Sequence, residues 1–122
     1  MYVWRIENPE GQGPWTGGGM GYMGFDVRYK GRAQDPSRHP NPHHDGLKLT
    51  KAHVCGASTL AGIRLWFNTK AQRTVLQSCG YRLRRYKVDP KTTQRGHFQT
   101  IFIKRTATLV EQRDLVSLKA NT

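Results

Sequence analysis

Apolar and polar residues alternate strictly at the start of the chain. Residues 2–7 (YVWRIE) follow this period of two, which predicts a half-buried strand with Arg5 on its less apolar face. The same alternation returns in residues 25–30 (FDVRYK) and predicts a second strand. The first segment is stopped by Asn8 and Pro9.

Helical spacing replaces the alternation in residues 58–80, which predicts a pair of short helices. Ser58 is a good N-cap residue for the first of them. Its apolar face comprises Leu60, Ile63, Trp66 and Phe67. The second helix is expected to start from Thr69 and to end at Gly80, since glycine suits the left-handed position after a helix. Its buried residues are expected to be Val75, Leu76 and Cys79.

Strand-forming residues dominate the chain again after the helix pair. In residues 81–88 (YRLRRYKV) the alternation slips, and a bulge at Arg84 and Arg85 would reconcile its two halves. A last clear strand starts at His97, whereas the pattern of residues 107–118 fits neither type of element alone. Strands, a helix pair and strands again predict an α+β fold with a mainly antiparallel sheet. The length of 122 residues predicts one domain over residues 1–122.

Two segments have the composition of flexible or lid-like loops, at residues 9–24 and 31–46. Seven of the thirteen glycines lie between Asn8 and Gly24, and three prolines and three histidines lie in the second segment. We interpret the first loop as the rim of a cleft; a disordered connector is the alternative. The candidate binding residues in these loops are Trp15, Tyr22, His43 and His44.

Positive charge is concentrated in one half of the chain. The net charge is +12, and residues 46–110 hold thirteen Lys and Arg against one acidic residue, Asp89. A field of this density attracts polyanions, which predicts nucleic acid or an acidic host protein as the partner. A solvated basic face that keeps a small protein soluble is the alternative. The candidate binding residues of this surface are Arg64, Arg73, Arg82, Arg84, Arg85 and Lys87.

Arginine and tyrosine interleave in residues 81–88, where they would give phosphate contacts with stacking surfaces between them. The competing interpretation is an exposed strand edge that its charge protects against pairing with other chains. No helix-turn-helix, zinc-finger or RNP motif accompanies the segment.

Metal and thiol chemistry find little support in the sequence. Nitrogen and sulfur ligands cluster within seventeen residues, namely at His39, His43, His44, His53 and Cys55. Pro40 and Pro42 prevent a helix from placing two of these histidines on one face, so no metal site is predicted. Cys55 and Cys79 are expected to be buried, reduced and structural. No apolar run is long enough for a signal peptide or a membrane span, which predicts a cytoplasmic protein without a membrane partner.

Several spaced motifs resemble those of small phage and prophage proteins of unassigned function. They are RIENPEGQGPW, HPNPHHDG, HVCGASTLAGIRLWF, GYRLRRYKV and HFQTIFIK, which together span most of the chain. The resemblance implies an accessory protein that acts on the host, by inhibiting a defence system or modifying a host enzyme, or by redirecting transcription.

The same layout is similar to a trimmed ADP-ribosyltransferase-like fold, and that resemblance implies NAD as a cofactor. Carried over, Arg5 takes the first-strand position that contacts NAD, Ser58 the position before the helix, and Gln99 the late-strand position. A glutamate there would stabilise a cationic transition state, which the neutral Gln99 cannot do. A binding protein on an enzyme-like scaffold is therefore the leading hypothesis, and an NAD-dependent transferase is the alternative.

Overall fold

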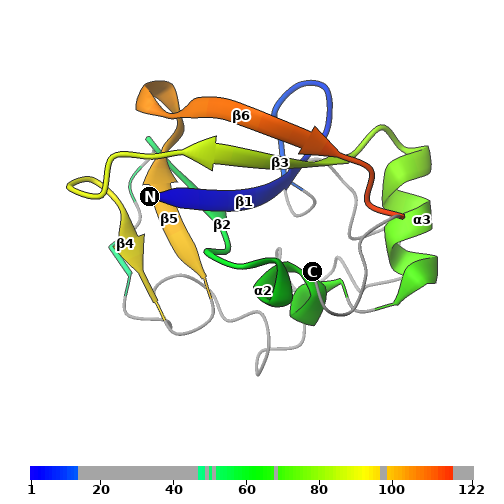
Figure 1. Cartoon of the computed structure of the whole chain (residues 1–122). Coiled ribbons are helices and arrows are strands. Elements are labelled where there is room, and N and C mark those ends of the chain that lie inside the picture. Colours follow the sequence, from blue (N-terminus) through cyan, green and yellow to red (C-terminus); the bar gives the residue numbers. More distant parts are fainter. Residues whose placement is uncertain (14–46, 49, 51, 68, 97–98, 117–122) are drawn as a thin grey trace.

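The computed structural model describes residues 1–13, 47–48, 50, 52–67, 69–96 and 99–116 (Figure 1). Over these ranges the chain forms two antiparallel three-stranded sheets and two short α-helices, which confirms the predicted α+β class. The predicted strand at 25–30, the loop at 31–46 and nearly all of the glycine-rich loop lie outside the described residues.

The first sheet has the strand order β1 (Tyr2–Glu7), β3 (Arg82–Lys87) and β6 (Thr108–Arg113). The alternation of residues 2–7 correctly predicted β1. The pairing of β1 with β3 is uninterrupted, so the expected bulge does not lie in β3. The irregularity falls between Arg85 and Tyr86 in the pairing with β6, where Val110 is the extra residue.

The second sheet has the order β2 (His53–Gly56), β5 (Thr100–Ile103) and β4 (Gln94–Arg95). Of these strands only β5 was predicted. An isolated antiparallel bridge joins the two sheets, because Trp4 and Ala57 exchange two backbone hydrogen bonds of 2.8 Å. The 3₁₀ turn η2 (Lys104–Thr106) leads from β5 into β6.

The predicted helix pair is present as α2 (Leu60–Trp66) and α3 (Lys70–Ser78). The N-cap of α2 is Thr59 rather than Ser58, because the Thr59 side chain accepts the Gly62 N–H bond. Thr69 caps α3 in a reciprocal capping box with Gln72. Gly80 follows with φ +95°, the left-handed conformation predicted for it.

Two hydrophobic clusters cover opposite faces of the first sheet. One, under the helices, comprises Trp4, Ile6, Ala57, Ile63, Phe67, Leu76, Tyr81, Leu83 and Leu115. The other, toward the second sheet, comprises Val3, Tyr86, Val88 and Phe102. The slipped alternation of residues 81–88 therefore reflects a change of the covered face along the strand.

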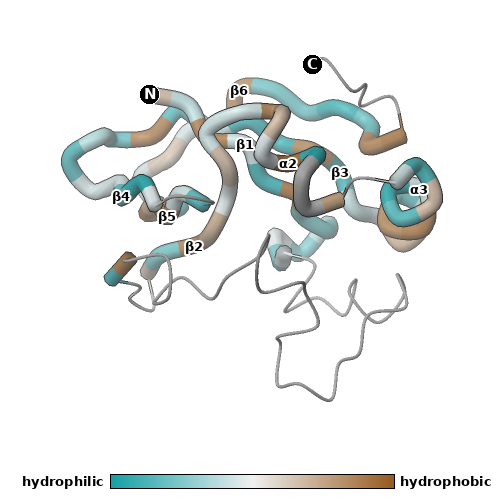
Figure 2. The backbone as a smooth tube through the Cα atoms, turned by 90° about the horizontal axis from the view of Figure 1, so that it is seen from below, coloured by the Kyte–Doolittle hydropathy of each residue, from teal (hydrophilic) through white to brown (hydrophobic). Residues whose placement is uncertain are grey.

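The helix α3 carries hydrophobic residues on one side and hydrophilic residues on the other (Figure 2). Leu76 lies in the core, but Cys79 is exposed as the C-cap, so the prediction of a buried Cys79 was wrong. The helix ends one residue before Cys79, and this turns its side chain away from the apolar stripe. Within the described ranges, no helix has the length and apolar character needed to cross a membrane.

Candidate functional site

A fully buried carboxylate, Glu7, lies at the end of β1. The sequence pattern placed it on the less apolar face of a half-buried strand. The second sheet covers part of that face, and Glu7 is enclosed by cationic side chains of β1, β3 and η2. A buried charge is tolerated only when it is paired and hydrogen-bonded.

The Glu7 carboxylate binds four side chains, and these five residues are called the Glu7 cluster below. Oε2 accepts bonds from Arg5 Nε at 2.8 Å and Lys104 Nζ at 2.6 Å. Oε1 accepts bonds from Arg84 at 3.2 Å and from the Tyr86 hydroxyl. Both oxygens are thus satisfied twice, which accounts for a charged group with no exposed surface.

Three cations surround one anion in this cluster, which leaves two positive charges in excess. Arg84 and Lys104 reach solvent, with 21% and 32% of their side chains exposed. Second bonds hold the cations in place: Arg5 donates to the Cys55 carbonyl at 2.6 Å, and Arg84 donates to Gln112 at 3.0 Å. The cluster is a fixed positive group with its outer side open to water.

Burial alone would raise the pKa of Glu7, but the hydrogen bonds from Lys104, Tyr86 and Arg5 outweigh it and hold that pKa below its ordinary value of 4.5. Burial first, and then the bond to Glu7, raises the pKa of Tyr86 from 10.0 to about 12. The cluster therefore favours a charged Glu7 beside a neutral Tyr86.

These pKa shifts predict a two-sided dependence of stability on pH. A lowered Glu7 pKa stabilises the fold above pH 4.5, and this contribution is lost as the pH falls through the folded value. A raised Tyr86 pKa contributes below pH 10, and this contribution is lost as the pH rises through about 12. Urea unfolding across the pH range should show a decline at both ends. In Glu7→Gln, a decline on the acid side as steep as in the wild type would contradict the assignment.

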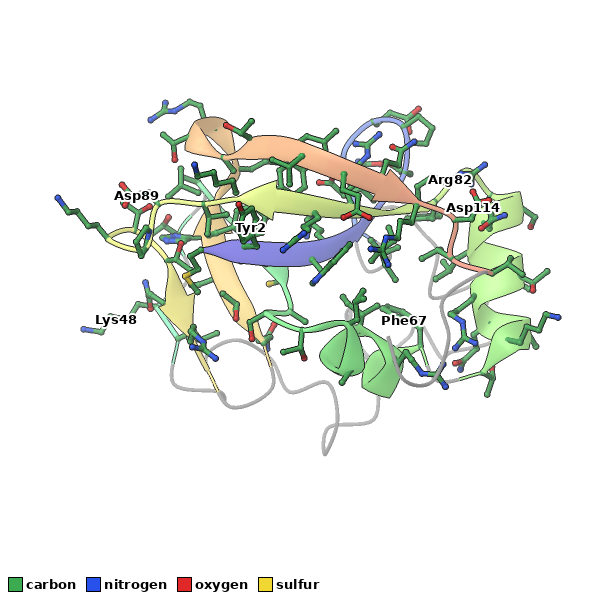
Figure 3. The ribbon with its side chains drawn as sticks, viewed as in Figure 1. Tyr2, Lys48, Phe67, Arg82, Asp89 and Asp114 are labelled. Carbon is green, nitrogen blue, oxygen red and sulfur yellow. The ribbon has the colours of Figure 1, made fainter. Side chains whose placement is uncertain are left out.

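The other face of the first sheet carries a stack of arginines and aromatic rings. The Arg85 guanidinium lies 4.2 Å from the centroid of the Tyr2 ring and 5.3 Å from that of Trp4. Arg113 lies 5.1 Å from the same Trp4 ring. Glu111 pairs with both arginines, at 3.7 Å to Arg85. Figure 3 shows Tyr2 over the β1–β3 pair, at the far end of the sheet from Arg82 and Asp114.

The four basic residues predicted as one surface on β3 are divided between the two faces of the sheet. Arg82 and Arg84 alternate with Arg85 and Lys87, and Arg84 belongs to the Glu7 cluster while Arg85 belongs to the stack. Arg82 pairs with Asp114 at 3.6 Å. Lys87 is exposed.

Arg73 does not lie on an exposed basic surface, contrary to the prediction. Its side chain points inward, is 5% exposed, and donates a 2.7 Å bond to the Phe67 carbonyl at the end of α2. Burial, and then the nearby charge of Arg64, lowers the pKa of Arg73. Arg64 itself is half-buried in the last turn of α2. Arg73 is therefore a helix-capping residue.

The three residues carried over from the transferase resemblance lie in different settings. Arg5 is bonded to Glu7 and to the Cys55 carbonyl, Ser58 is half-buried just before the N-cap of α2, and Gln99 is buried. The loop candidates Trp15, Tyr22, His43 and His44 lie outside the described residues.

Among the described residues, no group of three His, Cys, Asp or Glu side chains is arranged to hold a metal ion. Cys55 is half-buried, and burial raises the pKa of its thiol. A thiol in that state is a poor nucleophile. The sequence pattern gave no sign that Glu7 or Lys104 was special, although the surplus of bases in residues 46–110 requires a counter-charge.

The fold and these two charged groups define a small, basic α+β protein with one internally paired carboxylate. The sequence matches the Bacteriophage T4 Y00F protein family over residues 1–116, so the chain belongs to that phage family. The resemblance to phage proteins is thereby confirmed. Comparisons with curated proteins and with solved structures each found no match, and so give no support to an ADP-ribosyltransferase-like layout.

Proposed function

We propose that this phage-family protein acts by binding an acidic macromolecule of the host cell through its basic surface. The observation that carries the proposal is the imbalance of exposed charge. Seven described basic residues are exposed: Lys48, Lys70, Lys87, Lys91, Arg95, Arg105 and Arg113. The exposed acidic residues of the same ranges are Glu10, Asp89 and Asp114. Such a field draws in an acidic partner and speeds its association.

The Glu7 cluster strengthens this proposal. Its carboxylate neutralises only one of three cations, and the excess charge faces solvent through Arg84 and Lys104. Cations already held in place lose little side-chain entropy when an anionic group binds. An acidic partner would therefore meet preorganised charge.

Binding is favoured over the NAD-dependent transferase for a chemical reason. The Arg5 guanidinium that would contact NAD is already bonded to Glu7 and to the Cys55 carbonyl. The late-strand position holds the neutral Gln99. Releasing Arg5 for a cofactor would leave the buried Glu7 with fewer partners, which costs stability.

We expect the protein to bind sulfated heparin, as a generic acidic probe, at low salt. Its affinity should fall by more than tenfold between about 50 mM and 200 mM salt, because bound counterions are released. Charge reversals at Lys87 and Arg105, both exposed, should weaken binding several-fold in fluorescence titrations. Glu10→Gln removes an exposed acid and should leave the affinity equal or slightly higher. Absence of binding at low salt would contradict the proposal.

A further inference from the structure

The exposed part of the first sheet is organised in cross-strand rows. In the register of β1, β3 and β6, Tyr2 is opposite Lys87, and Trp4 is opposite Arg85. Arg85 is in turn opposite Glu111. Because side chains in one row share a face, aromatic and cationic groups lie next to each other on this surface. We call the four residues Tyr2, Trp4, Arg85 and Arg113 the stacking face.

We infer that the stacking face binds single-stranded nucleic acid. This inference rests on the proposed function, because it names the chemical class of the acidic partner. Unpaired bases stack on tyrosine rings and on flat guanidinium groups. The geometry offers both, since Tyr2 is 42% exposed and the Arg85 guanidinium lies 4.2 Å from its ring centroid.

The guanidinium groups are held flat enough to serve as stacking surfaces. Glu111 pairs with Arg85 and with Arg113, and each arginine also lies over the Trp4 ring. Arg85 therefore lies between the two aromatic rings of β1, and its charge is fixed by a carboxylate on β6. A base that stacks here meets a surface ordered before binding.

A phosphate contact is available next to the stacking position. Lys87 is exposed, pairs with Tyr2 across the strands, and has no acidic residue opposite it in β1 or β6. A nucleotide with its base on Tyr2 can thus place its phosphate by the Lys87 ammonium. An acidic protein would use Lys87 but would gain nothing from the ring, and in a duplex the base faces are already stacked on each other. The combination favours a single strand.

The experiment measures binding of the full chain to fluorescent single strands of about twelve nucleotides, since such sites span roughly 4–16 nucleotides. DNA and RNA single strands, their duplexes and heparin serve as probes at one salt concentration. We expect single strands to bind at least tenfold more tightly than duplexes. The DNA and RNA arms show which strand is preferred.

Matched variants separate stacking from charge. Tyr2→Ala should weaken single-strand binding about tenfold and leave heparin binding unchanged, whereas Tyr2→Phe should retain both. Arg85→Lys keeps the charge but loses the plane, so it should also weaken single-strand binding selectively. Lys48→Gln removes a charge beside β4, apart from the stacking face (Figure 3), and should not discriminate between the probes. A melting curve for each variant verifies that it is folded.

The outcomes distinguish the two proposals. If single strands bind no better than duplexes or heparin, or if a folded Tyr2→Ala binds them as the wild type does, the stacking face is overturned while an acidic partner stands. The same holds if only an acidic polypeptide such as poly-glutamate binds. If neither nucleic acid, heparin nor poly-glutamate binds at low salt, both proposals fail.

Discussion

Replacement of Glu7 by glutamine is expected to lower the free energy of unfolding by about 3 kcal/mol, because removing one partner of a buried ion pair strands the others. For a chain of this size such a loss corresponds to a fall of roughly 10 °C in the melting temperature. The estimate is at the lower end of the usual range because Arg84 and Lys104 can turn partly toward water.

The expected loss follows from the geometry of the carboxylate. Each oxygen accepts two bonds, from Arg5 and Lys104 on one side and from Arg84 and Tyr86 on the other. Glutamine keeps the shape but offers one oxygen, and its amide group would direct N–H bonds toward donors. Two of the four partners would lose their acceptor, and three cations would remain without a counter-charge.

Glu10→Gln provides the matched control, since it makes the same chemical change at an exposed carboxylate three residues away. Its unfolding free energy should remain within about 0.5 kcal/mol of the wild type. Urea or thermal unfolding of the three proteins measures both values. Equal stability of the Glu7 and Glu10 variants would show that the cluster contributes little.

The elements predicted correctly from the sequence are those with a local signal. The alternation in residues 2–7 identified β1, and the helix pair followed from apolar spacing and the N-cap position of Thr69. Gly80 was also correct, because a left-handed C′ position selects glycine by sterics alone. These signals depend on neighbours a few residues apart.

The features that were missed depend on distant pairing. The strand β2 contains only His53–Gly56, and it is stabilised by β5 nearly fifty residues later, which no local pattern reveals. The two faces of β3 looked like one basic surface because its sequence does not show that a sheet and a helix layer cover opposite sides. Glu7 was overlooked for the same reason, since Arg84 and Lys104 reach it only in the folded chain.

The junction between the two sheets gives the second large prediction, at Gly56. A Cβ atom added there would stand 2.6 Å from Val3 Cγ1 and well within van der Waals contact of the Trp4 carbonyl oxygen. That oxygen accepts the Ala57 N–H bond of the only bridge between β1 and β2 in the described part of the chain. Gly56→Ala must therefore push the two strands apart or distort the bridge.

We expect Gly56→Ala to cost about 3 kcal/mol, which combines overpacking with the weakening of two backbone hydrogen bonds. Gly62→Ala is the control: its added Cβ meets Ala57 Cβ at 3.1 Å, but alanine favours the helix by about 1 kcal/mol and offsets that contact. Thermal unfolding should thus separate the two variants by several degrees. Equal melting temperatures would mean that the sheets tolerate separation at this point. A strongly destabilised Gly56→Ala would instead identify the Trp4–Ala57 bridge as the contact on which the alignment of the Glu7 cluster depends, since Arg5 in β1 bonds to the Cys55 carbonyl beside it.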